Sequence, residues 1–301
     1  MPAPAASGRV NLLDESPAVV PPRVVVAGYW RVAVFLGVAL LACVGLQLAT
    51  VFLFRLGRGG APSLAWSVAT LAVGLLVAHA VVLRRYHDGH WDFVGLQRAG
   101  LTPSALLRAG LLGVLTIGLP SVLLLSAGEL RVEAGDATGL APWKSALPLL
   151  AVLVPAALWE ELALRGYLFA VLRERFDARG ALVVTSAIFG ALHLPNAGAT
   201  ALSTAAVALA GVFLGLVRLS TGSLYAAWAA HLAWNLTLSF ALRTPVSGID
   251  LTMRGYHVVD AGPDWLTGGA WGPEGGVAAM LGMIVASWYM VRRMRREESE
   301  T

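Results

Sequence analysis

Two adjacent glutamates and an arginine lie inside an otherwise apolar stretch of the chain. Glu160, Glu161 and Arg165 occur in the run Trp-Glu-Glu-Leu-Ala-Leu-Arg. An ionisable side chain at membrane depth costs at least about 2.5 kcal/mol, so it persists where it pairs, lines a wet cavity or takes part in chemistry. Two later apolar stretches each contain a histidine, His193 and His231. Most polar groups of the apolar stretches are therefore concentrated in a few places that could form one site.

Spacing along the predicted helices suggests a different role for each of these residues. Glu161 and Arg165 are four residues apart and share a helix face, so they can pair. Glu160 points about 100° away from Glu161 around the helix, which leaves its carboxylate free. A desolvated carboxylate near a histidine can take a proton from water. His231 and Asn235, also four apart, offer donors for a developing oxyanion. The set contains no obvious nucleophile and favours hydrolysis by activated water.

The composition indicates a helical membrane protein. Of the 301 residues, 57% are apolar and 13% are charged, against about 45–50% and about 25% in soluble domains. Apolar runs near the roughly 20 residues that cross a bilayer predict the spans. The eight predicted spans are residues 29–54, 63–83, 105–127, 145–170, 180–195, 199–218, 222–242 and 275–291. We predict an all-α polytopic membrane protein of about eight transmembrane helices, with a polar catalytic cavity within the bundle.

The chain is predicted to form one membrane domain with two short tails. The parts are a flexible cytosolic N-terminal tail at 1–28, the membrane domain at 29–291 with its catalytic core at about 145–240, and a basic cytosolic C-terminal tail at 292–301. The Gly- and Pro-containing segment 243–274 is predicted mainly as a connection, with a cover over the outer face as the alternative. The single cysteine, Cys43, excludes a disulfide framework.

Basic residues predict which side faces the cytoplasm. With both termini inside, fifteen basic residues fall on the inner side: Arg9, Arg23, Arg31, Arg84, Arg85, Arg98, Arg108, Arg173, Arg175, Arg179, Arg218, Arg292, Arg293, Arg295 and Arg296. Six fall on the outer side: Arg55, Arg58, Arg131, Lys144, Arg243 and Arg254. Cytoplasmic loops are enriched in Lys and Arg. We therefore predict a multi-pass protein of the plasma (inner) membrane with both termini in the cytoplasm.

The same spans predict convergence in depth. At about 1.5 Å per residue, Glu160, His193 and His231 lie roughly 15, 20 and 14 Å from the inner ends of their spans. Three predicted helices therefore present polar groups at a similar level of the membrane.

Three motifs follow one another along the chain. They are E-E-x-x-x-R at 160–165, F-x-x-x-H at 189–193 and H-x-x-x-N at 231–235. In order and type they resemble the motifs of the CAAX protease and bacteriocin-processing family, also called CPBP or Abi, which includes the eukaryotic type II CAAX prenyl endopeptidases. The resemblance covers about residues 145–240.

The resemblance implies an intramembrane endopeptidase with a site opening toward the cytosol. In that case Glu160 and His193 activate water, His231 and Asn235 stabilise the oxyanion, and the other two charged residues of the first motif support the site. The implied substrate is a membrane-associated or lipid-anchored peptide or protein, and the implied partners are this substrate and the lipid bilayer, with no nucleic acid.

The role of a metal is left open. Family members are often described as metalloproteases. Glutamate and histidine are both zinc ligands, so Glu160, His193 and His231 would hold a divalent metal such as zinc if one is used. The same three residues could equally position water without a metal.

Two other classes of function stay open. The chain could be a non-catalytic membrane scaffold or regulator that retains the family fold, with the polar residues holding helices together. It could also be a transporter with a carboxylate proton relay, although no inverted repeat of the kind found in many transporters is evident in the sequence.

Overall fold

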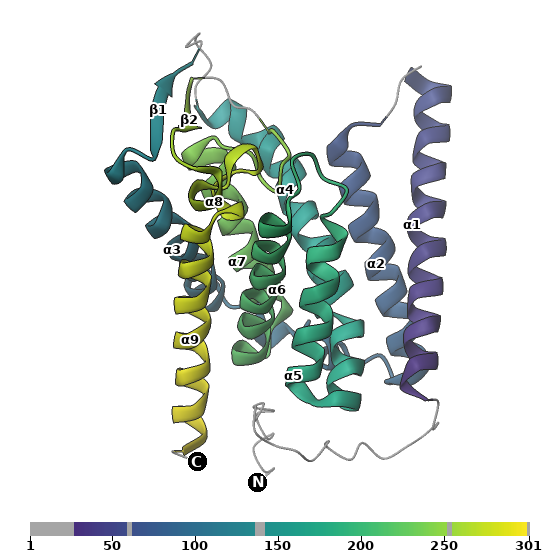
Figure 1. The fold of residues 1–301 in the computed structure, drawn as a ribbon. Helices are drawn as coiled ribbons and strands as arrows, with labels where there is room; N and C mark the ends of the chain where they lie inside the picture. The colour runs from purple at the N-terminus through teal and green to yellow at the C-terminus, as the bar shows by residue number, and fades with distance from the viewer. Residues whose placement is uncertain (1–26, 59–61, 136–141, 252–254, 300–301) are drawn as a thin grey trace.

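The protein is a bundle of long helices. The structure, a computed structural model, describes residues 27–58, 62–135, 142–251 and 255–299. The long helices are α1 (Gly28–Arg58), α2 (Leu64–Tyr86), α3 (Pro103–Ala127), α4 (Pro142–Arg165), α5 (Tyr167–Leu192), α6 (Ala201–Thr221), α7 (Leu224–Leu236) and α9 (Val277–Ser299). They run roughly side by side (Figure 1).

Short elements join the long helices. They are the 3₁₀ helices η1 (Trp91–Val94), η2 (Arg98–Gly100), η4 (Gly269–Trp271) and η5 (Pro273–Gly275), the π-helical turn η3 (Thr237–Leu242), the one-turn helix α8 (Asp264–Thr267), and the strands β1 (Leu130–Ala134) and β2 (Tyr256–Asp260). The two strands pair antiparallel, with Leu130 opposite Asp260. This small sheet is an addition to the predicted all-α architecture.

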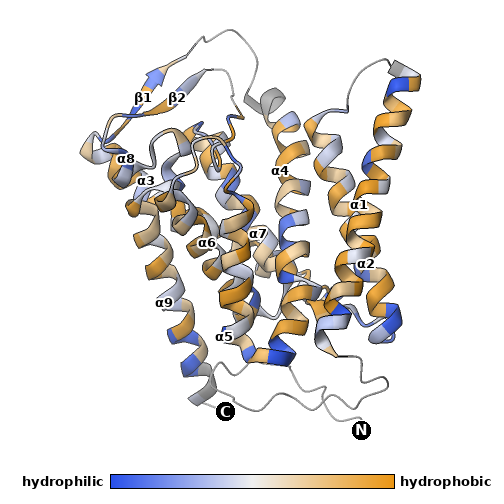
Figure 2. Ribbon diagram, turned by 45° about the vertical axis from the view of Figure 1, so that its right-hand side comes forward, coloured by the Kyte–Doolittle hydropathy of each residue, from blue (hydrophilic) through white to orange (hydrophobic). Residues whose placement is uncertain are grey.

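Length and apolar composition confirm the predicted class, an all-α polytopic membrane protein. Five segments of the described chain can cross a membrane by these criteria: Gly28–Gly57, Leu64–Tyr86, Pro103–Ala127, Ala146–Leu192 and Ala201–Thr221. Hydrophobic residues make up much of the long helices (Figure 2). On α1, for example, the side chains of Leu40 and Leu41 are 65% and 76% exposed. Such a surface suits lipid contact, since lipid tails are as apolar as leucine.

The predicted fourth and fifth spans, 145–170 and 180–195, have different boundaries in the structure. The helix α4 ends at Arg165, and α5 contains a break at Asp177, where φ is 79° and ψ is −179°. The Asp177 carboxylate accepts a hydrogen bond from the Gly180 N–H at 2.8 Å, and Asp tolerates a positive φ better than most residues. The first arm of α5 therefore continues the direction of α4, and the second arm turns back through the bundle.

Gly166 makes the close junction between α4 and α5 possible. A Cβ atom at this position would lie 2.2 Å from Nε2 of His79 on α2. His79 is fully buried; its Nδ1 donates to the Leu75 carbonyl at 2.7 Å, and its Nε2 accepts from the Tyr167 N–H at 3.1 Å. Because the first N–H groups of a helix lack intrahelical partners, His79 satisfies one of those of α5. The histidine of α2 therefore has a structural partner.

We expect Gly166→Ala to destabilise the protein by about 1–3 kcal/mol, the range for overpacking a buried contact. The new methyl group would displace His79 from its bond to the α5 backbone. Thermal unfolding of the detergent-purified protein measures the effect. Gly37→Ala in α1 is the matched control, since nothing lies within 4 Å of its Cβ position. Equal melting temperatures for the two variants would contradict the role of Gly166.

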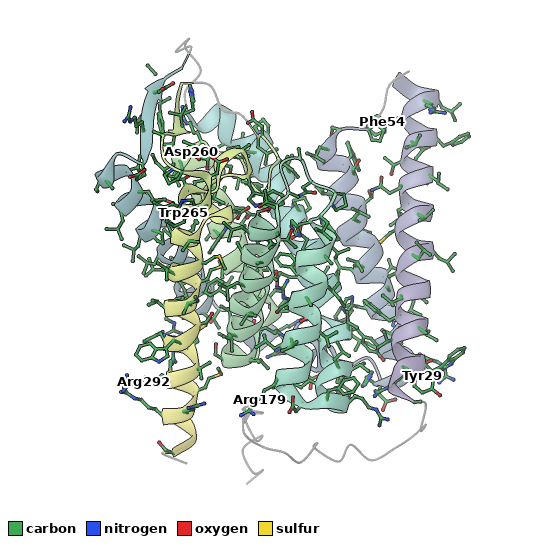
Figure 3. The ribbon with its side chains drawn as sticks, viewed as in Figure 1. Tyr29, Phe54, Arg179, Asp260, Trp265 and Arg292 are labelled. Atoms are coloured by element: carbon green, nitrogen blue, oxygen red, sulfur yellow. The ribbon has the colours of Figure 1, made fainter. Side chains whose placement is uncertain are left out.

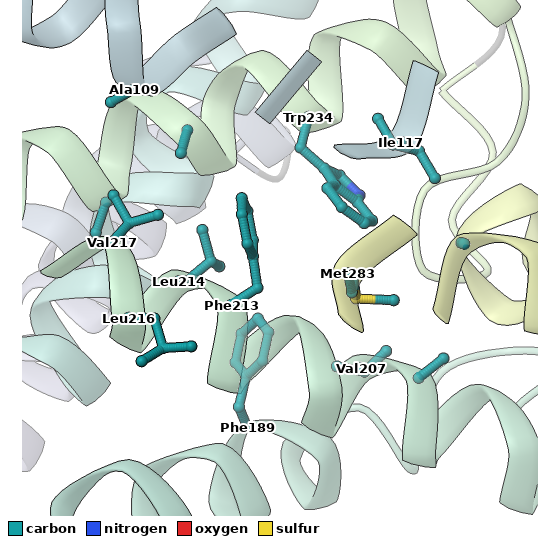
Figure 4. Packing of buried hydrophobic residues seen from close by; sticks show 14 of the residues in the cluster. Ala109, Ile117, Phe189, Val207, Phe213, Leu214, Leu216, Val217, Trp234 and Met283 are labelled. Atoms are coloured by element: carbon teal, nitrogen blue, oxygen red, sulfur yellow. The ribbon is translucent and has the colours of Figure 1, made fainter. Parts of the chain in front are cut away.

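The core gathers the helices that carry the polar motifs. Phe213 and Leu214 of α6 pack with Phe189 of α5 and Trp234 of α7 in one cluster (Figure 4). The helices α5 and α6 approach closely, because a Cβ at Gly211 would lie 2.9 Å from the backbone of Ser186. Small residues at a helix interface allow such an approach in membrane proteins. This packing holds α4, α5, α6 and α7 around a common centre.

The two ends of the bundle differ in character. Tyr29, Arg179 and Arg292 lie at one end, which carries the first residue of α1 and the last of α9; we call it the basic end (Figure 3). Phe54, Asp260 and Trp265 lie at the opposite end (Figure 3). That end carries β1, β2 and the segments 243–251 and 255–276, and we call it the loop end.

Candidate active site

A cavity of about 240 Å³ lies among α2, α4, α5, α6 and α7. Four of the six predicted site residues line it: Glu160, His193, His231 and Asn235. Glu161 and Arg165 lie behind its wall, with fully buried side chains. The structure thus brings together the three motifs at one place, as the predicted depths require.

Glu161 is the centre of a buried network. Its Oε1 accepts from Arg165 Nη1 at 3.2 Å and from His231 Nδ1 at 2.9 Å. The first contact is the predicted i,i+4 pair. The second comes from packing of α7 against α4 and joins the first and third motifs. Glu161, Arg165 and His231 therefore form a hydrogen-bonded triad, in which Glu161 binds Nδ1 of His231.

Arg165 makes further contacts across the bundle. Its Nη2 donates to the Gly211 carbonyl of α6 at 3.0 Å, and its guanidinium carbon lies 4.5 Å from the centre of the Phe189 ring. Planar guanidinium groups suit both kinds of contact. Arg165 consequently connects α4 with α5 and α6.

Glu160 faces the cavity. Its side chain is 20% exposed, and its Oε2 lies 3.7 Å from His231 Nε2. That distance is too long for a hydrogen bond, although it is within ion-pair range. The carboxylate therefore remains available to a water molecule or a substrate in the cavity.

His193 lies one residue beyond the end of α5, as its C-cap, rather than within a span that continues to residue 195. Its Nδ1 contacts the Phe189 carbonyl at 2.8 Å. Because a carbonyl only accepts, Nδ1 carries the hydrogen, and in a neutral ring Nε2 is then an acceptor. The ring also meets Phe189 edge to face at 4.8 Å between centroids. Two contacts with Phe189 thus hold this histidine beside the cavity.

The residues do not form a metal-ligand cluster as they are placed. Over the described ranges, no group of three or more His, Cys, Asp or Glu side chains is arranged to hold a metal ion. Of the predicted ligand set Glu160, His193 and His231, the last already uses Nδ1 to bind Glu161.

Glu274 is a site residue that sequence reasoning missed. It lines the cavity and is 7% exposed. Its carboxylate accepts from Trp234 Nε1 at 2.6 Å, from the Ser247 N–H at 2.5 Å and from the Ser247 hydroxyl at 2.8 Å. The segment 243–274 therefore contributes to the cavity wall rather than serving only as a connection. The sequence signal was slight: one acid in a run of Gly, Pro and Trp.

We expect Glu274→Gln to loosen the loop over the cavity. Glutamine has one acceptor oxygen in place of two, and a buried donor left unpaired costs about 1–3 kcal/mol. Amide hydrogen exchange should increase at residues 244–251 and should be unchanged in α2. Glu133→Gln on the exposed face of β1 is the matched control. Unaltered exchange at residues 244–251 would show that Glu274 does not hold the loop.

The fold and site define a polytopic helical membrane protein with a carboxylate–histidine cluster inside its bundle. Residues 142–237, from α4 to the start of η3, match the family described as Type II CAAX prenyl endopeptidase Rce1-like. This match confirms the resemblance read from the three motifs: the part of the chain that carries them is similar to a family of CAAX prenyl endopeptidases. No curated protein matches the chain.

Proposed function

We propose that this protein is an intramembrane endopeptidase that hydrolyses a peptide bond of a membrane-associated or lipid-anchored polypeptide. The observation that carries the proposal is that Glu160, His193, His231 and Asn235 line one cavity inside the helix bundle. A base, an acceptor and two donors around one space are the groups that water-mediated amide hydrolysis needs.

The composition of the cavity wall favours cleavage at an internal peptide bond of the substrate rather than at its C-terminus. It is mostly apolar, with residues such as Val152, Trp159 and Phe189, and it includes the carboxylates of Glu160 and Glu274. Neither lysine nor arginine is among its lining residues in the described part of the chain. Because such a wall has no fixed cation to pair with a terminal carboxylate, it suits an apolar internal segment better than a free C-terminus.

The reaction can be written with the residues in place. A water molecule between Glu160 and His193 attacks the substrate carbonyl carbon while Glu160 takes one of its protons. The amide of Asn235 and the Nε2 side of His231 face the oxygen that becomes negatively charged. When the C–N bond breaks, the proton on Glu160 passes to the leaving nitrogen, and a carboxylic acid and an amine result.

The network behind the cavity supports this role for His231. Glu161 accepts a hydrogen bond from Nδ1 of His231, so Nδ1 carries one proton. When Nε2 carries a second proton, the ring is a cation that donates toward the cavity. The two carboxylates, Glu160 and Glu161, then face two cations, Arg165 and His231. A balanced set of four charges is less costly to bury than an unpaired one.

Mass spectrometry of membrane peptides tests the proposal. Cells with the wild-type protein should contain cleavage products that are missing from cells with Glu160→Ala or His193→Ala at equal protein levels. Metal analysis of the purified wild-type protein alongside its activity tests the metal-ligand alternative. A scaffold would function in cells with either variant, and an unchanged set of peptides would refute the endopeptidase proposal.

A further inference from the structure

Part of the cavity wall is formed by residues at the loop end of the bundle. Besides the polar residues, its wall includes Leu64 and Val68 from the first turns of α2, and Val246, Ile249 and Leu251 from the segment after η3. The helix α2 begins at the loop end, where α1 has ended (Figure 1). The cavity therefore reaches the end of the bundle opposite the first residue of α1 and the last of α9.

Packed side chains separate the cavity from the basic end. In α7, Leu224, Ala227 and Ala230 precede His231 and are fully buried. In α5, Tyr167 and Phe169 follow the first motif and are at most 1% exposed. Protein interiors pack with few voids larger than a water molecule. A substrate therefore cannot enter the cavity from the basic end, because packed side chains block the way.

The basic residues assign the two ends to the two sides of the membrane. At the basic end the described chain carries Arg31, Arg84, Arg85, Arg98, Arg108, Arg173, Arg175, Arg179, Arg218, Arg292, Arg293, Arg295 and Arg296. At the loop end it carries only Arg55, Arg58, Arg131, Lys144 and Arg243. Because cytoplasmic loops are enriched in Lys and Arg, the basic end is the cytoplasmic one.

We infer that the cavity opens on the non-cytoplasmic side of the membrane and takes its substrate from there. The inference rests on the proposed function for the identity of the substrate. That substrate is an apolar polypeptide segment at the outer surface of the membrane, such as the stretch next to a membrane anchor. The sequence predicted cytoplasmic termini, and the family resemblance implied a site that opens to the cytosol. In this fold the termini and the cavity opening lie at opposite ends, so only one of the two can be correct. The distribution of arginines favours cytoplasmic termini.

Single cysteines test the side of the opening without any use of activity. In a Cys43→Ala background, Ile249→Cys and Asp250→Cys place a thiol near the cavity mouth, at two exposed positions of the loop end. His90→Cys places one at the basic end, where the native side chain is 71% exposed. A membrane-impermeant maleimide is added to right-side-out and to inside-out membrane vesicles.

The two loop-end cysteines should react in right-side-out vesicles, and His90→Cys should react in inside-out vesicles only. The reverse pattern would overturn the inference and would leave the endopeptidase proposal untouched, because labelling needs no catalysis. In a second measurement, the Ile249→Cys protein labelled with a bulky maleimide should cleave its substrate at least tenfold more slowly than the same protein before labelling. Labelled protein with an unchanged rate would exclude access through this mouth.

Discussion

Glu160→Gln should lower the rate of peptide hydrolysis by about 10²–10⁴-fold, the contribution typical of a general base. Glutamine has nearly the same shape and cannot take a proton from water. Among the residues that the structure describes, none lies within hydrogen-bonding distance of the Glu160 carboxylate, since its contact with His231 is 3.7 Å long, and its side chain is 20% exposed. The loss of activity should therefore occur without a loss of folded protein.

The measurement compares initial cleavage rates of purified wild-type and variant protein under the same conditions. Glu133→Gln is the matched control, because the same substitution then falls on a side chain that is 59% exposed on β1. His193→Ala should also lose activity, since its Nε2 acceptor disappears. A Glu160→Gln protein that cleaves at the wild-type rate would remove Glu160 from the reaction.

Arg165→Met should destabilise the protein by about 3–5 kcal/mol, the usual result of removing one partner from a buried ion pair. Glu161 would lose one of its two hydrogen-bond donors, and the Gly211 carbonyl would lose its donor. The change should lower the melting temperature in detergent and the yield of monodisperse protein. Arg175→Met is the matched control at an exposed position of the same chain.

A double-mutant cycle separates the pair from the rest of the network. Glu161→Gln alone leaves Arg165 as a buried cation without its carboxylate, so it should be as harmful as Arg165→Met. The variant that combines Glu161→Gln with Arg165→Met should lose less stability than the sum of the two, since neither charge is then unpaired. Strict additivity would mean that the two side chains do not act as a pair.

Local spacing determined the parts of the site that depend on one helix. The predicted pairing of Glu161 with Arg165 holds because residues four apart lie on one face of an α-helix. The same rule predicted that Glu160 points away from that pair, which it does by facing the cavity. The membrane class followed in the same way, because long apolar runs have few stable alternatives to a helix in lipid.

Contacts between distant segments were decided by the tertiary structure alone. Seventy residues separate His231 from Glu161, and no helical period relates them. Glu274 binds Trp234 and Ser247, and the path of the intervening loop depends on how α7 packs on α3 and how α9 packs on α3 and α6. The break at Asp177 depends on a turn closed by its own carboxylate, which apolar periodicity does not register.

The inferred side of the cavity opening likewise depends partly on the sequence and partly on the tertiary structure. Counts of arginine along the sequence predict which ends of the helices face the cytoplasm, because that bias is a property of each loop by itself. The predicted spans place Glu160, His193 and His231 at similar depths, because helical rise is constant. The burial of the side chains that precede His231 in α7, and the place of Ile249 in the cavity wall, arise from how distant parts of the chain pack together. Such packing is a three-dimensional property, and only the folded chain decides it.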